Sequence, residues 1–202
     1  MTKEQEILTA AEDEFFTKGF DATSTAVIAK KAGVTHAMVN YYFRTKEQLF
    51  VKVLDNNVRA LIGKIMSLMN PEGTIADVAS HAAEVLFDSL NTKREFPFII
   101  QDLSRTHPEF LEQYWKKVEA FFSESIKKHS RMLAEQIRNG TTAQCTMNDV
   151  YDTILTLAVS PYLHIPMLRN VARMDEHQID SYLEMHRKEM LRIIKSRYSV
   201  SD

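Results

Sequence analysis

Apolar residues recur three and four positions apart along almost the whole chain, which is the spacing of one face of an α-helix. No stretch alternates apolar and polar residues for long enough to predict a β-strand. Residues that favour helix ends, and the few glycines and prolines, separate the apolar runs. The pattern therefore predicts an all-α fold.

The helix boundaries follow from these separators. A break at 70–73, Asn-Pro-Glu-Gly, ends the helix that begins at Lys46. Pro161 and Pro166 fall inside a later helix and are expected to kink or break it, because each proline removes a helix hydrogen bond. We expect helices over residues 3–18, 23–32, 36–43, 46–69, 75–90, 109–138, 149–169 and 178–197, with an apolar segment at 98–103.

Residues 23–49, TSTAVIAKKAGVTHAMVNYYFRTKEQL, contain two short helical patterns joined by a glycine turn. Thr23 is expected to cap the first helix, and Gly33 ends it, because glycine tolerates the left-handed backbone that stops a helix. Thr35 then caps the second helix, and Thr45 caps a third. This order is typical of a helix-turn-helix that reads DNA.

The second of these helices has two different faces. Val39 and Phe43 are four residues apart and form its apolar, inward pair. A major groove admits one helix and presents donors, acceptors and thymine methyl groups, and Asn40 is able to pair with adenine through two hydrogen bonds. The expected outward face consists of His36, Ala37, Asn40 and Tyr41.

The charge pattern agrees with DNA contact by one part of the chain. Between Ala22 and Lys46 there are four basic residues and no Asp or Glu, whereas the whole chain has a net charge of −2. A basic window in a near-neutral chain favours one DNA-contacting module over a protein that coats nucleic acid. The alternative is a plain helical hairpin with a solvated basic edge.

The residues of this segment also carry a family resemblance. The order Gly-Phe, DATST, IAKKAGVT, YYF and TKEQL resembles the N-terminal domain of TetR-family transcriptional regulators over about residues 7–54. Three positions differ from the usual pattern of the family: Thr25 replaces a commonly apolar residue, Asn40 an aromatic one, and Met38 a small or hydroxyl-bearing one. The resemblance implies an N-terminal DNA-binding domain at 1–48 and a helical ligand-binding and dimerisation domain at 49–202.

The resemblance also implies roles for individual residues. Thr23, Ser24, Tyr42 and Lys46 would contact phosphates. The positions that would face the bases are Thr35, His36, Ala37, Met38 and Tyr41, to which the helix geometry adds Asn40.

For the remaining helices, the resemblance implies a homodimer formed by the last two helices and a small-molecule pocket among the middle ones. The break near Pro97 and the prolines at 161 and 166 favour a cavity, because interrupted helices pack less completely. The pocket candidates are Phe96, Phe98, Trp115, Phe122, Tyr151, Tyr162 and Met167. The dimer-interface candidates are Tyr151, Ile154, Leu155, Ile179, Leu183, His186 and Met190. The alternative for each residue is an ordinary position in the core of the protomer.

Composition narrows the class of protein further. The chain has 202 residues, of which 45% are hydrophobic, enough for a substantial core. The single cysteine, Cys145, excludes an internal disulfide framework and suits a reducing cytoplasm. No apolar run approaches the length of a membrane span, and the polar start MTKEQE does not resemble a signal peptide.

The sequence gives no indication of an enzyme. It contains no phosphate-cradling glycine loop, no nucleophile elbow and no HExxH or paired CxxC spacing, so we expect no catalytic residues, metal site or cofactor. We expect a dimeric transcriptional regulator, a repressor that leaves its palindromic double-stranded DNA operator when an unknown small-molecule effector binds. The alternative is a helical dimer that acts through protein partners without specific DNA binding.

Overall fold

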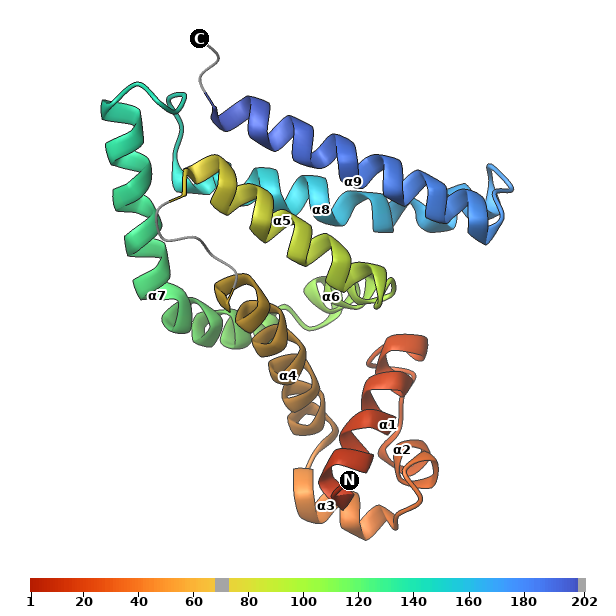
Figure 1. Cartoon of the computed structure of the whole chain (residues 1–202). Helices are drawn as coiled ribbons and strands as arrows, with labels where there is room; N and C mark the ends of the chain where they lie inside the picture. The colour runs from red at the N-terminus through yellow and green to blue at the C-terminus, as the bar shows by residue number, and fades with distance from the viewer. Residues whose placement is uncertain (68–72, 200–202) are drawn as a thin grey trace. The chain divides into compact units, whose positions relative to one another are not determined.

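The computed structural model describes residues 1–67 and 73–199, without the side chains at positions 62, 65–67, 113, 117, 118 and 120–122. Every regular element in these residues is an α-helix, so the all-α prediction is confirmed. The helices are α1 (Lys3–Lys18), α2 (Thr25–Lys31), α3 (His36–Phe43), α4 (Lys46–Ser67), α5 (Ile75–Asn91), α6 (Phe96–Thr106), α7 (Pro108–Arg138), α8 (Met147–Asn170) and α9 (Glu176–Tyr198) (Figure 1).

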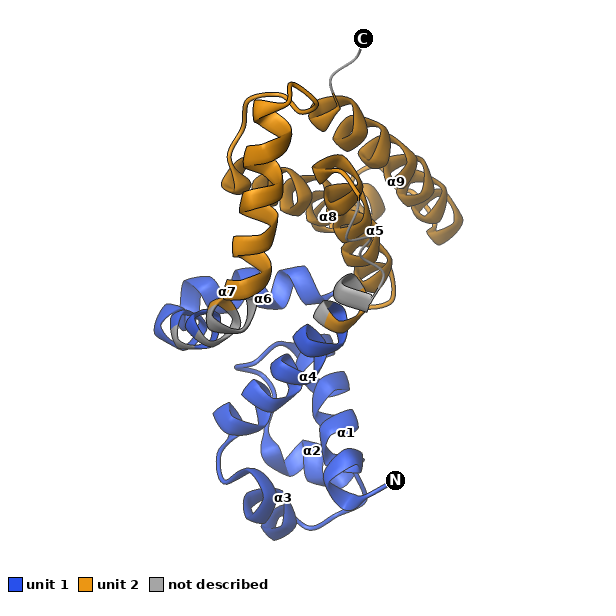
Figure 2. Ribbon diagram, turned by 60° about the vertical axis from the view of Figure 1, so that its left-hand side comes forward, with its two compact units in different colours: residues 1–62, 95–116 blue, residues 63–94, 117–202 orange. Residues whose placement is uncertain are grey.

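The helices form two compact units (Figure 2). The first unit consists of residues 1–62 and 95–116, and the second of residues 63–94 and 117–202. The helices α4 and α7 each contribute residues to both units. The domain boundary expected after residue 48 stays a prediction.

Aromatic side chains hold the first unit together. The rings of Phe15 and Phe50 are fully buried and meet edge to face, with their centroids 4.8 Å apart. Phe20, which follows α1, contacts Phe50 at 5.1 Å and Phe110 of α7 at 6.2 Å. A fully buried ring such as that of Phe15 or Phe50 contributes about 1.5–3 kcal/mol through burial. The helix α1, the start of α4 and the start of α7 therefore share one aromatic core.

In the second unit, α5 packs against both α8 and α9, which run alongside each other (Figure 1). Tyr162 of α8 is fully buried, and its hydroxyl donates to the carbonyl oxygen of Phe87 at 2.8 Å. The second unit is thus a helical bundle whose core includes polar atoms that have partners.

Capping residues explain where the last two helices begin. Thr146 caps α8, and its backbone N–H donates to the carboxylate of Asp149, three residues into the helix. At α9, the Asp175 side chain accepts from the backbone N–H of Gln178, and the Gln178 side chain accepts from the backbone N–H of Asp175. The expected starts at 149 and 178 were therefore two residues late, because those side chains stand at the third helical position of a capping box. The helix α8 is continuous through Pro161 and Pro166, so neither proline breaks it.

Candidate nucleic-acid interface

The helices α2 and α3 form the expected helix-turn-helix. Gly33 has a φ of +63°, which supplies the left-handed residue of the turn, and the amide of Val34 donates to the carbonyl of Ala29 at 3.0 Å. Thr35 caps α3, since its hydroxyl accepts from the amide of Met38 at 3.3 Å. The turn thus fixes how α2 is connected to α3.

The faces of α3 are divided as the sequence predicts. Val39 and Phe43 are buried, with 1% and 6% of their surface exposed, and they fix α3 onto the core. Tyr41 is 81% exposed and Tyr42 is 40% exposed, and their rings meet edge to face at 5.3 Å. The other exposed residues of this helix are His36, Ala37 and Asn40, whereas Met38 is partly buried.

The prediction that Thr23 caps α2 is wrong, because Ser24 is the capping residue and accepts from the amide of Val27 at 3.3 Å. Thr23 is only 3% exposed. Its hydroxyl donates to the carbonyl oxygens of Gly19 at 2.8 Å and Glu14 at 3.1 Å. The Thr23 hydroxyl therefore closes the end of α1 and is not presented to a phosphate, whereas Ser24 is exposed.

Two of the four basic residues of the window have partners inside the protein. Lys31 forms ion pairs with Asp13 and with the buried carboxylate of Glu14. The Lys46 ammonium donates to the carbonyl oxygens of Phe20 at 2.9 Å and Thr23 at 3.1 Å, and it lies 4.3 Å from the centre of the Phe20 ring. Lys46 thus binds the turn between α1 and α2, a role that helix spacing does not reveal.

The other two basic residues of the window are exposed. Lys30 lies in the last turn of α2, and Arg44 follows α3. Arg44 has a φ of +56°, a region that a side chain with a Cβ adopts rarely. The exposed positive charge beside α3 therefore comes from Lys30 and Arg44 more than from Lys31 and Lys46.

The structure does not gather the pocket candidates into one site. Phe96, Phe98 and Trp115 belong to the first unit, whereas Tyr151, Tyr162 and Met167 belong to the second. Tyr162 is a core residue with a bonded hydroxyl, and Trp115 and Met167 are 44% and 55% exposed. The side chain of Phe122 lies outside the described residues. Tyr162 is therefore corrected from a pocket candidate to a core position.

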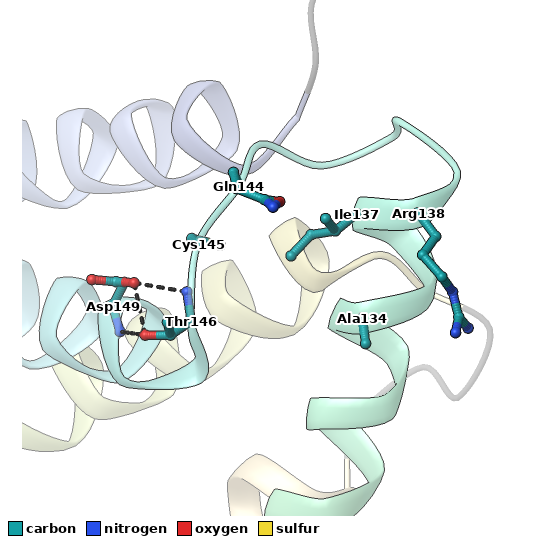
Figure 3. Close-up of a pocket in the computed structure, with 7 residues that line it drawn as sticks. All are labelled: Ala134, Ile137, Arg138, Gln144, Cys145, Thr146 and Asp149. Carbon is teal, nitrogen blue, oxygen red and sulfur yellow. Dashed lines mark hydrogen bonds between the residues drawn. The ribbon is translucent and has the colours of Figure 1, made fainter.

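A pocket of about 570 Å³ lies at the junction of α7 and α8 (Figure 3). Its lining includes Ile137, Cys145 and Asp149 but none of the pocket candidates. Burial raises the pKa of the Cys145 thiol, so the thiolate is disfavoured, and hydrogen bonds from Thr146 lower the pKa of Asp149. Arg138 extends to the side of α7 away from Cys145 (Figure 3). The pocket lining thus carries an ionised carboxylate, Asp149, beside a thiol that burial keeps neutral.

Four of the dimer-interface candidates are core residues of the protomer. Ile154 is 8% exposed, and the others are 2% exposed or less, so none is available to a partner: Ile154, Ile179, Leu183 and Met190. The apolar stripes of α8 and α9 face each other and α5, which is the physical reason for this correction. His186 is partly buried, with its Nε2 2.8 Å from the carbonyl oxygen of Leu157, and Tyr151 is partly buried too. Only Leu155, at 56%, is openly exposed among the candidates.

Comparison with known proteins supports the DNA-binding assignment. Residues 7–53 match the family model of bacterial regulatory proteins, tetR family. The HTH-type transcriptional repressor Rv3405c of Mycobacterium tuberculosis is 28% identical over 146 residues, which cover 67% of this chain and 75% of the relative. Among solved structures, the Streptomyces coelicolor protein SCO4942, described as a transcriptional regulator, aligns with a TM-score of 0.73 at 21% identity over 98% of both chains. The fatty acid degradation regulator FadR of Bacillus halodurans aligns with a TM-score of 0.66 at 16% identity over 95% of both chains.

The helix-turn-helix and the matches together define a DNA-binding transcriptional regulator, and the expectation that the chain is not an enzyme is confirmed by its relatives. The tetR-family signature covers residues 7–53, so the N-terminal part of the chain is similar to the DNA-binding domain of TetR-family transcriptional regulators. In the described part of the chain, no helix combines the length and apolar character needed to cross a bilayer.

Proposed function

We propose that this protein is a homodimeric repressor that binds a palindromic DNA operator through α3 and leaves it when a small molecule binds the C-terminal helices. One observation supports this most directly: α3 exposes Asn40, Tyr41 and His36 while Val39 and Phe43 anchor it to the core. A helix held in this way is able to enter a major groove without rearranging its own packing.

The roles proposed for individual residues follow their exposure. Asn40 offers both a donor and an acceptor to an adenine, and the small side chain of Ala37 allows close approach or contact with a thymine methyl group. Tyr41, Met38 and His36 complete the base-facing set, with Thr35 at the start of the helix. Phosphate contacts come from Ser24 and Tyr42, joined by the exposed cations Lys30 and Arg44.

The dimer proposal rests on where large apolar side chains are exposed. Among the described residues, the exposed large apolar side chains outside residues 1–42, other than Trp115, lie on α8, on α9 or directly after α8. They are Leu155, Met167, Val171 and Met185. Exposed apolar side chains of this size commonly mark a protein interface. A two-fold axis would give two α3 helices, which read half-sites about 34 Å apart.

The release proposal rests on unpaired polar atoms in the second unit. Among the residues that the structure describes, neither the Ser80 hydroxyl nor His129 Nε2 has a hydrogen-bond partner, although these residues are only 7% and 6% exposed. Such atoms are costly unless something binds them, so they are suitable contacts for a bound molecule. Coupling of ~1–3 kcal/mol between effector and operator would release DNA by population shift.

The experiment is capture of fragmented genomic DNA from the source organism by the purified chain at near-physiological salt, followed by sequencing. We expect enrichment of a palindrome beside a few genes, which would also suggest effectors to test. An Asn40→Ala/Tyr41→Ala variant is the control and should lose the enrichment. If only salt-sensitive background binding remains for the unaltered protein, the helical dimer acting through protein partners becomes the better account.

A further inference from the structure

A hydrogen bond joins the first residues of α2 and α3. The hydroxyl of Thr25 lies 2.9 Å from Nε2 of His36, eleven residues later in the chain. Thr25 is partly buried and His36 is exposed. A side chain of α2 is therefore hydrogen-bonded to a side chain of α3, the helix proposed to enter the groove.

This bond restricts what the imidazole of His36 is able to do. A neutral imidazole has one donor and one acceptor nitrogen, and the bond to Thr25 occupies Nε2. Nδ1 is then the ring nitrogen left for another partner. Because Nε2 is tethered, the ring samples fewer orientations than a free surface histidine, and less rotamer freedom is lost when it contacts DNA.

We propose that Thr25 is a positioning residue for DNA recognition: its hydroxyl orients His36 so that Nδ1 meets a base edge in the operator. Thr25 itself contacts no base. This inference rests on the proposed function, and it adds that part of the sequence preference is set by a residue on α2. Ala37, the exposed neighbour of His36, leaves room for the ring to approach the groove.

Two substitutions separate the hydroxyl from the shape of the side chain. Thr25→Val keeps the branched shape and removes the hydroxyl, whereas Thr25→Ser keeps the hydroxyl and removes the methyl group. Valine has a suitable shape here, since the position is partly buried and, within the described part of the chain, the Thr25 hydroxyl has His36 as its one hydrogen-bond partner. Neither variant alters Val39 or Phe43, which anchor α3.

The test selects duplexes from a randomised double-stranded DNA library with the full-length chain. Affinities for the selected duplex and for a scrambled duplex are then measured at one salt concentration for the unaltered protein, Thr25→Val, Thr25→Ser, His36→Ala and the Thr25→Val/His36→Ala double variant. Thr25→Val should weaken binding to the selected duplex about fivefold or more, leave the scrambled duplex unchanged and relax one base position in each half-site. Thr25→Ser should match the unaltered protein.

A purely structural bond gives a different result. If Thr25→Val selects the same sequence with the same affinity, or weakens both duplexes equally, the positioning role is wrong. It is also wrong if Thr25→Val has its full effect when His36 is already alanine, because the effect must pass through His36. If the unaltered protein selects no sequence at all, the proposed function fails and this inference fails with it. A preserved motif in Thr25→Val overturns this inference alone.

Discussion

The imidazole Nε2 of His186 in α9 lies 2.8 Å from the carbonyl oxygen of Leu157 in α8. Leu157 stands four residues before Pro161, whose missing N–H would otherwise bond that carbonyl. His186 therefore supplies the donor that proline removes, which explains how α8 stays continuous at this position. The ring also stacks on Phe87, with centroids 6.2 Å apart.

This relationship predicts the outcome of a double-mutant cycle. His186→Phe keeps an aromatic ring but leaves the Leu157 carbonyl without its donor, so we expect a loss of about 1–3 kcal/mol in the free energy of unfolding. In a Pro161→Ala background the alanine amide is able to bond that carbonyl, and the loss should become smaller. Urea unfolding of the four proteins measures the coupling, and equal losses in both backgrounds would contradict it.

Lys46 gives a second prediction, because its ammonium holds the turn between α1 and α2. Lys46→Met keeps the aliphatic stem over Phe20 but removes the hydrogen bonds, so the unfolding free energy should fall by about 1–3 kcal/mol. The slope of DNA affinity against salt should stay unchanged. A slope reduced by about one per subunit, with stability intact, would instead show the phosphate contact implied by the family resemblance.

His129 predicts how stability depends on pH. Burial lowers the pKa of its imidazole, so in the acidic range the unfolded chain binds a proton that the folded chain does not. Unfolding free energy should therefore fall as the pH drops through about 6.5, the pKa of an unperturbed histidine. His129→Leu should reduce this dependence.

The proposed dimer predicts the effect of a charge on the exposed apolar positions. Leu155→Glu and Met185→Glu replace side chains that are 56% and 69% exposed, so folding should tolerate both. Each should weaken a dimer that buries these positions, and sedimentation should show a larger monomer fraction. Arg131→Glu on α7 changes charge at an exposed site and serves as the control. A dimer that survives both substitutions would place the interface elsewhere.

The local order of the chain was predictable from sequence because it depends on short-range features. The turn at Gly33, the cap at Thr35 and the inward pair Val39 and Phe43 follow from helix spacing and were found as expected. The cap at Ser24 was missed because Thr23 is an equally good capping residue by type, and only its burial shows that its hydroxyl serves α1.

Contacts between distant residues were not predictable in this way. The apolar stripes of α8 and α9 indicate a buried face but do not say whether the neighbour belongs to the same protomer, so Ile179 and Met190 were assigned to an interface although they lie in the core. Likewise, nothing in the local pattern connects Thr25 to His36 or Lys46 to Phe20. These contacts depend on how the helices pack against one another, and that packing cannot be derived from the local pattern of a single sequence.

The proposed function requires that the exposed face of α3 reads DNA sequence. Its most direct test is the affinity of Asn40→Ala and Tyr41→Ala for an enriched operator duplex and for a scrambled duplex, at one salt concentration. We expect each variant to lose ~1–3 kcal/mol on the operator and to keep its affinity for the scrambled duplex, so that the specificity ratio falls. Equal weakening on both duplexes, or no change on either, would contradict the claim that this face of α3 enters the groove.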